Sequence, residues 1–164
     1  MILGHKIRLP ISTWTGGKSA GDCGPIAVIN ALKWLGDGPT LKKDYWIIRD
    51  CLVSPLIGGT NPKWMAKCLR KLPFLKVYEP RSLMSDKFFR LLRKPKTVTL
   101  ISFKLDNRKR MGHTCAVIIY KNKLVFINLY VEEKATQLSE TEFKRLMIHQ
   151  PIDWPNIIFL TRIK

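Results

Sequence analysis

The sequence predicts a single α+β domain in which N-terminal helices pack on a C-terminal antiparallel sheet. Segments with helical spacing and clear end signals fill the first half of the chain, whereas runs rich in β-branched residues fill the second half. A short turn joins two of these runs, which favours antiparallel pairing. A chain of 164 residues that is 46% apolar is long enough for one core, so we expect one domain over residues 1–164.

The best-defined helix is expected to begin at Cys23. Pro25 suits the first turn of a helix, and the apolar run that follows ends at Gly36, a typical helix stop. Residues 1–22 show no periodicity and are expected to form an extended, loop-like segment. The helix therefore presents a cysteine at its first position.

The remaining elements follow in chain order. Four further helices are expected, each with a capping residue before it, over 40–52, 61–72, 85–93 and 139–148. A loop is expected over 54–59. Five runs are expected to be strands, over 74–78, 97–103, 114–120, 124–130 and 157–161, the last of which closes the sheet.

Cys23 is the candidate nucleophile. At a helix start it lies beside unpaired backbone N–H groups and the positive end of the helix dipole. Both are expected to favour the thiolate, which is the reactive form of cysteine.

A candidate base and its orienting group follow about ninety residues later. His113 precedes the strand 114–120, and Asn128 lies near the end of the strand 124–130. Antiparallel pairing of these strands brings the two residues together. An asparagine carbonyl can accept the imidazole N–H and leave the other ring nitrogen facing a thiol.

These residues resemble a known family. Asp22-Cys23-Gly24-Pro25, Gly112-His113 and Asn128 are similar to the motifs of the papain-like peptidases that remove double-glycine leaders from bacteriocin precursors, and of their relatives. The resemblance implies a papain-like α+β fold and a cysteine peptidase mechanism. Cys23 would attack the carbonyl carbon, His113 would carry the proton and Asn128 would orient His113. It implies no metal and no organic cofactor.

A peptide or protein substrate is then expected in a cleft beside Cys23. Six residues are its candidate contacts: Trp14, Gly17, Lys18, Ser19, Asp22 and Gly112. Asp22 is also a candidate helix cap, the role that we favour. The family usually has a glutamine about six residues before the nucleophile, whereas no glutamine precedes Cys23, so Lys18 or Ser19 would have to supply that oxyanion donor.

The charge of the chain suggests a second partner. The net charge is +17, and residues 63–110 hold fifteen lysines and arginines against three acids. Such a surface favours polyanions such as nucleic acid or an anionic cell-wall polymer. Two alternative functions stay open: a catalytically decayed papain-like scaffold that is a basic, nucleic-acid- or virion-associated structural protein, and a cell-wall endopeptidase or amidase.

Other features limit the location of the protein. No run of 18 apolar residues occurs, and the first residues do not form a signal-peptide core, so we expect a soluble protein that is cytoplasmic or virion-associated. The four cysteines show no zinc-like spacing and are expected to be free thiols. Cys51, Cys68 and Cys115 are expected to be buried.

Overall fold

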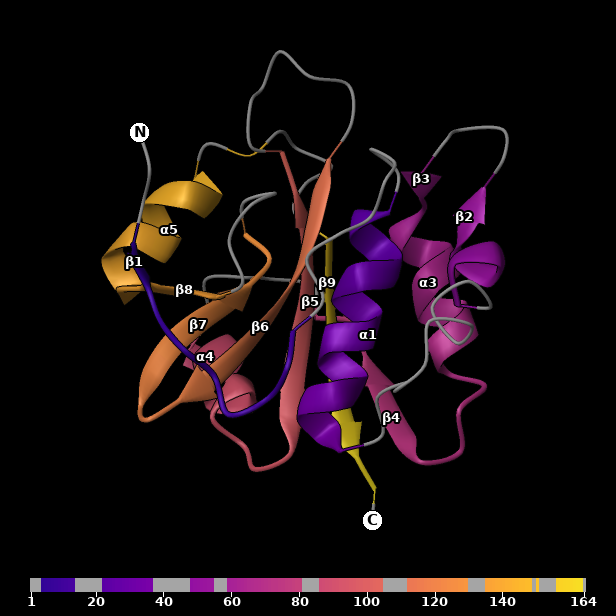
Figure 1. The fold of residues 1–164 in the computed structure, drawn as a ribbon, viewed down its shortest axis with the longest axis horizontal. Helices are drawn as coiled ribbons and strands as arrows, with labels where there is room; N and C mark the ends of the chain where they lie inside the picture. The colour runs from indigo at the N-terminus through magenta and orange to yellow at the C-terminus, as the bar shows by residue number, and fades with distance from the viewer. Residues whose placement is uncertain are drawn as a thin grey trace.

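The computed structural model describes residues 4–13, 22–36, 48–54, 59–80, 86–104, 112–129, 135–148, 150 and 156–163. It is a mixed α+β structure around a seven-stranded antiparallel sheet with the strand order β1-β8-β7-β6-β5-β9-β4 (Figure 1). The strands of this sheet are β1 (His5–Lys6), β4 (Leu75–Tyr78), β5 (Thr97–Phe103), β6 (His113–Tyr120), β7 (Lys123–Ile127), β8 (Ala135–Leu138) and β9 (Asn156–Arg162). The described helices are α1 (Cys23–Leu35), α3 (Pro62–Leu69), α4 (Asp86–Leu92) and α5 (Glu140–Ile148). A separate two-stranded ribbon pairs β2 (Val53–Ser54) with β3 (Gly59–Thr60).

The central strand β5 has the predicted bounds, whereas the C-terminal strand β9 does not have the predicted position at the edge of the sheet. β5 is buried along its whole length and coincides with the predicted strand 97–103. The C-terminal strand was expected to close the sheet, but β9 lies between β5 and β4, with Leu75 opposite Arg162. The edge on this side is therefore β4, a strand of four residues.

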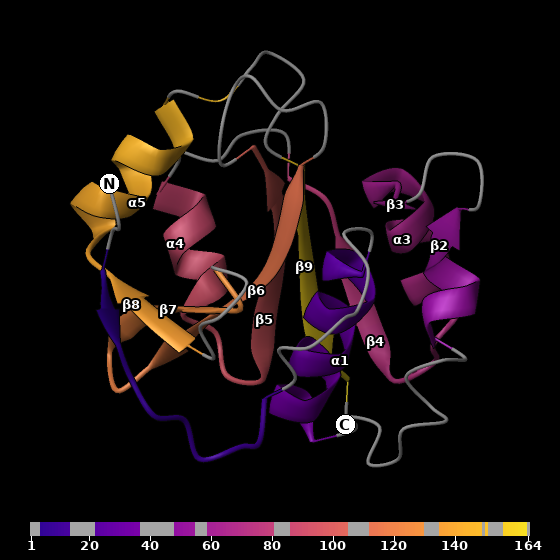
Figure 2. The ribbon, with the colours of Figure 1, turned by 45° about the horizontal axis from the view of Figure 1, so that its top comes forward.

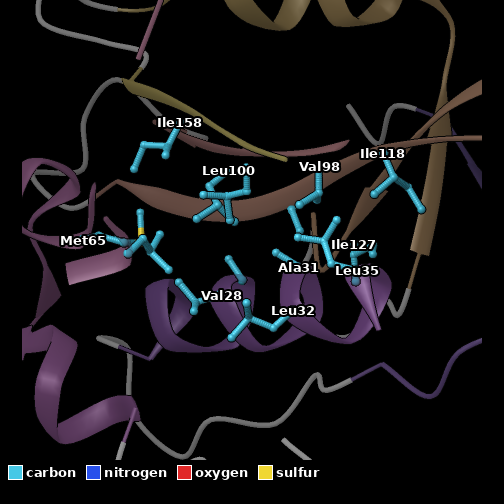
Figure 3. Close-up of a cluster of buried hydrophobic side chains, with 14 of the residues drawn as sticks. Val28, Ala31, Leu32, Leu35, Met65, Val98, Leu100, Ile118, Ile127 and Ile158 are labelled. Carbon is cyan, nitrogen blue, oxygen red and sulfur yellow. The ribbon is translucent and has the colours of Figure 1, made fainter. Parts of the chain in front are cut away.

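The two faces of the sheet carry different cores. The first is aliphatic and forms where Val28, Ala31 and Leu32 of α1 pack on alternate residues of the strands (Figure 3). The second is aromatic and includes Phe88 of α4 and Phe143 of α5, whose rings stack with centroids 5.5 Å apart. Figure 2 shows α1 and α4 on opposite sides of β5 and β6. Alternation along each strand thus assigns successive residues to different cores.

Local end signals are confirmed where the chain is described. Gly36 adopts the left-handed conformation that ends α1, with φ of +89°. The Asn61 side chain accepts a hydrogen bond from the backbone N–H of Lys63 and begins α3. Ser139 and Glu142 bond to each other's backbone N–H at 3.1 and 2.8 Å, which is the predicted capping box.

Several elements differ from the prediction. The short strands β1, β2, β3 and β8 were not predicted, because each forms by pairing with a neighbouring strand and not from a local pattern of its own. Of the predicted helix 40–52, residues 48–52 are helical and 40–47 lie outside the described residues. All four cysteines are free, and Cys115 is buried, but Cys68 is only partly buried and Cys51 is exposed. Cys51 therefore does not belong to the core.

The first turn of α1 lies close to the β2–β3 ribbon. A Cβ atom built on Gly24 would lie 2.4 Å from Oγ1 of Thr60, whereas one built on Gly59 would meet nothing within 4 Å. We therefore expect Gly24→Ala to lower the free energy of unfolding by about 1–3 kcal/mol through overpacking.

Chemical denaturation checks this prediction, with Gly59→Ala as the matched control. The control should stay within about 0.5 kcal/mol of the unmodified protein. Equal stability of the two variants would show that α1 and Thr60 are not in contact.

Candidate active site

The site lies at the end of the sheet where α1 and β6 both begin (Figure 1). Cys23 is the first residue of α1 and is partly buried. The backbone N–H and the hydroxyl of Thr114 on β6 both lower the pKa of Cys23, which places the thiol beside the start of this strand. Thr114 in turn lies 2.8 Å from Ser102 on β5, measured between the two hydroxyl oxygens. The nucleophile predicted on the helix thus contacts the residue that follows the predicted base.

The electrostatics of the thiol differ from the prediction. Burial raises the pKa of Cys23, and the hydrogen bonds from Thr114 and Gly24 only partly oppose this effect. The backbone N–H groups of Cys23 and Gly24 at the helix start do lower the pKa of the thiol, as expected. The net direction is nevertheless upward, because burial disfavours the charged form of the sulfur more strongly than these groups stabilise it. Cys23 is a neutral thiol near pH 7.

His113 is held in one tautomer. Its Nε2 atom lies 2.6 Å from the backbone oxygen of Asn128. A carbonyl oxygen can only accept, so Nε2 carries the proton and Nδ1 has a free lone pair. Burial lowers the pKa of His113 more than this hydrogen bond raises it. The ring is thus a neutral imidazole with one basic nitrogen.

Asn128 orients His113 through its main chain and not through the amide that we predicted. It has φ of +64°, a left-handed conformation that asparagine adopts more readily than most residues. It follows the last residue of β7, and its backbone oxygen bonds to the first residue of β6. Its side-chain Oδ1 is buried and has no hydrogen-bond partner among the described residues.

Cys23 and His113, which were expected to face each other, lie toward different sides of β6. Among the residues that the structure describes, no hydrogen bond joins the thiol to the imidazole. The pleat explains the separation: Thr114 and Ala116 share one side of β6, and Ala116 belongs to the α1 core. The ring of His113 packs edge-on against Phe103 of the aromatic core, with centroids 6.0 Å apart.

Asp22 occupies the position directly before α1, where a capping residue is expected. Its side chain, however, makes no hydrogen bond to the first N–H groups of the helix. Instead the carboxylate is buried and lies 2.7 Å from Nε of Arg49, a partly exposed side chain. The charge of Arg49 compensates the burial of this carboxylate, which explains why the predicted cap is not formed.

The other predicted contacts are only partly described. Gly112 directly precedes β6 and is partly buried. Trp14, Gly17, Lys18 and Ser19 lie outside the described residues. The sequence analysis did not predict that Thr114, Thr60 and Arg49 lie at the site. For Thr60 the sequence did contain a signal: Gly24, whose missing side chain allows the close approach.

A metal centre has no support in the described part of the chain. No group of three histidine, cysteine or acidic side chains lies close enough there to hold an ion. Within the same residues, no helix is both long and apolar enough to cross a membrane.

Comparisons with known proteins add no family. A scan against models of protein families finds no match to this chain, and a search of curated proteins finds none either. The resemblance to the leader peptidases therefore rests on the residues of the site themselves.

The role of the Asn128 main chain can be tested by removing its side chain. We expect Asn128→Gly to keep the Nε2–H tautomer of His113, because glycine accepts a positive φ and retains the carbonyl. The ¹⁵N chemical shifts of the imidazole report the tautomer. A change to the Nδ1–H tautomer would show that the amide side chain, and not the carbonyl, orients the ring.

The pKa of Cys23 predicts a specific alkylation profile. Because burial favours the thiol, half-maximal labelling by iodoacetamide should occur at a pH above the ordinary cysteine value of about 8.5. Thr114→Val removes a bond that lowers the pKa, so it should move the midpoint to still higher pH, whereas Thr114→Ser should retain the midpoint. Peptide mass mapping separates Cys23 from the exposed Cys51. A midpoint below pH 8 would contradict this account.

Proposed function

We propose that this chain is a papain-like cysteine peptidase, or a related hydrolase that cleaves acyl bonds. The observation that carries the proposal is the packing of α1, which begins at Cys23, on β6, which begins at His113, with Thr114 close enough to lower the pKa of the thiol. It supports a cysteine and histidine pair, because the helix start and the strand start meet at one end of the sheet. The unprotonated Nδ1 of His113 supports the role of a base.

The neutral state of both groups defines the mechanism. His113 would take the thiol proton at Nδ1 as the sulfur of Cys23 attacks the substrate carbonyl carbon. The tetrahedral intermediate would collapse to a thioester as the imidazolium returns the proton to the leaving amine. Water, deprotonated by the same nitrogen, would then release the acid and regenerate the thiol. In the free protein the backbone carbonyl of Asn128 accepts from Nε2–H.

This mechanism requires a movement of the His113 ring. In the free protein the ring contacts Phe103, and catalytic hydrogen bonds are often formed only in the complex with substrate. His113 is the first residue of β6, so the regular strand restrains it on its C-terminal side only. Rotation of the side chain toward α1 is the step that substrate binding would have to favour.

The α1 N-terminus is the proposed oxyanion site. The first four N–H groups of a helix have no partner within the helix, and that of Cys23 lies beside the nucleophile. An oxyanion that forms at this position would accept from this N–H group.

Peptide cleavage tests the proposal. An unbiased peptide library that includes Gly-Gly sequences should be cleaved by the unmodified protein, with products identified by mass spectrometry. Cys23→Ala should lower the rate by about 10³-fold or more, and His113→Ala by a comparable factor. Cys51→Ala is the matched control, because it removes an exposed thiol.

Three results would count against the proposal. They are cleavage that persists in Cys23→Ala, cleavage that His113→Ala leaves unchanged, and the absence of both cleavage and Cys23 labelling by a peptidyl electrophile. Release of peptides from purified peptidoglycan, with no cleavage of the library, would favour the alternative of a cell-wall endopeptidase.

A further inference from the structure

The edge of the sheet at β4 carries a second functional surface. On the side of β4 that faces α4, the side chains of Lys76 and Tyr78 are exposed. The Nζ atom of Lys87, at the beginning of α4, lies 5.5 Å from the centre of the Tyr78 ring. Helix α4 and the edge strand thus form one patch.

This patch is basic over its whole extent. Arg90 and Lys94 follow Lys87 at helical spacing, and all three are exposed. We call Lys76, Tyr78, Lys87, Arg90 and Lys94 the β4–α4 surface. None of its four cations forms an ion pair with a carboxylate within the described ranges. The adjacent acid, Glu79, is paired with Arg70.

An exposed aromatic ring lies beside one of these cations, Lys87. Tyr78 is 39% exposed, and Phe159 supports its ring from the neighbouring strand at a centroid distance of 6.5 Å. A tyrosine fixed in this way can stack on a flat ligand. Phosphate-binding cations around a stacking ring are the chemical requirements of a single-stranded nucleic acid site.

We propose that the β4–α4 surface binds single-stranded nucleic acid, with one base stacked on Tyr78 and the backbone phosphates on the four cations. This binding does not depend on the proposed hydrolase activity. Duplexes lack free base faces, and anionic cell-wall polymers lack bases, so neither uses the ring in this way.

Another exposed aromatic residue in the part of the chain that the structure describes repeats the arrangement. Trp64 on α3 is 47% exposed, and Nζ of Lys67 lies 5.4 Å from its ring centre. Its indole N–H donates to the backbone oxygen of Cys51, which fixes the ring. This second pair offers a further stacking position on α3.

Fluorescence anisotropy of a labelled 20-nucleotide DNA strand tests the proposal. The test uses Cys23→Ala protein, so that hydrolysis does not interfere. The triple variant Lys76→Ala, Lys87→Ala and Lys94→Ala should bind at least about tenfold more weakly, and the slope of log K against log salt should fall by about 2. A second triple variant removes the same charge from exposed lysines elsewhere: Lys121→Ala, Lys123→Ala and Lys144→Ala. It should bind within about threefold of the parent.

The ring is tested separately. Tyr78→Ala should weaken binding of the strand about tenfold, whereas Tyr78→Phe should bind like the parent because it keeps the aromatic face. Teichoic acid and a DNA duplex should compete more weakly than the strand, and their binding should not depend on Tyr78.

Four outcomes would overturn the proposal. They are no detectable binding of the strand, equal losses in the two lysine triples, unchanged binding by Tyr78→Ala, and stronger binding of the duplex or of teichoic acid than of the strand. Circular dichroism of each variant establishes that a loss of binding does not come from unfolding.

Discussion

The packing of α1 against β6 is the constraint on which the rest of the structure depends. The helix buries Val28, Ala31 and Leu32 on the aliphatic face of the sheet, and this contact places its first residue beside Thr114. On its other side, the first turn of α1 lies close to Thr60 of β3, because Gly24 has no side chain. Without the packing of α1 on β6, the thiol would be a solvated cysteine at a helix end, and nothing would bring it near the start of a strand. The aliphatic core therefore positions the chemistry as well as stabilising the fold.

The same packing explains why the thiol is less acidic than its position in the sequence suggests. A helix N-terminus stabilises an anion by roughly 0.3–1 kcal/mol when exposed, and a buried charge can cost several times more. The helix start can be recognised in the sequence from Cys23, Gly24 and Pro25. The burial of the thiol depends on residues far along the chain. A protein with both a neutral thiol and a neutral imidazole avoids uncontrolled alkylation and oxidation, since the thiolate is the reactive species.

The elements that could be predicted from the sequence are those whose conformation is decided by neighbouring residues in the chain. The strand 97–103 and the stop at Gly36 were predicted because a β-branched run or a left-handed glycine decides the conformation locally. The short strands β1 and β8 form only because β7 offers partners, which no local pattern records. In the site, pairing of neighbouring strands was enough to bring His113 to Asn128. It could not show that the carbonyl replaces the amide, because that depends on the positive φ of Asn128.

The proposed catalytic site and the β4–α4 surface are separable on geometric grounds. β6 and β4 are three strands apart in the sheet, which corresponds to about 14 Å. Exposed charges at this distance are largely screened at physiological ionic strength, where the Debye length is about 8 Å. The cations around Tyr78 therefore have little influence on the ionisation of Cys23 or His113, and burial dominates both groups. A polyanion at the β4 edge would act on substrate choice or location of the protein, and the chemistry at Cys23 would remain the property of α1 and β6.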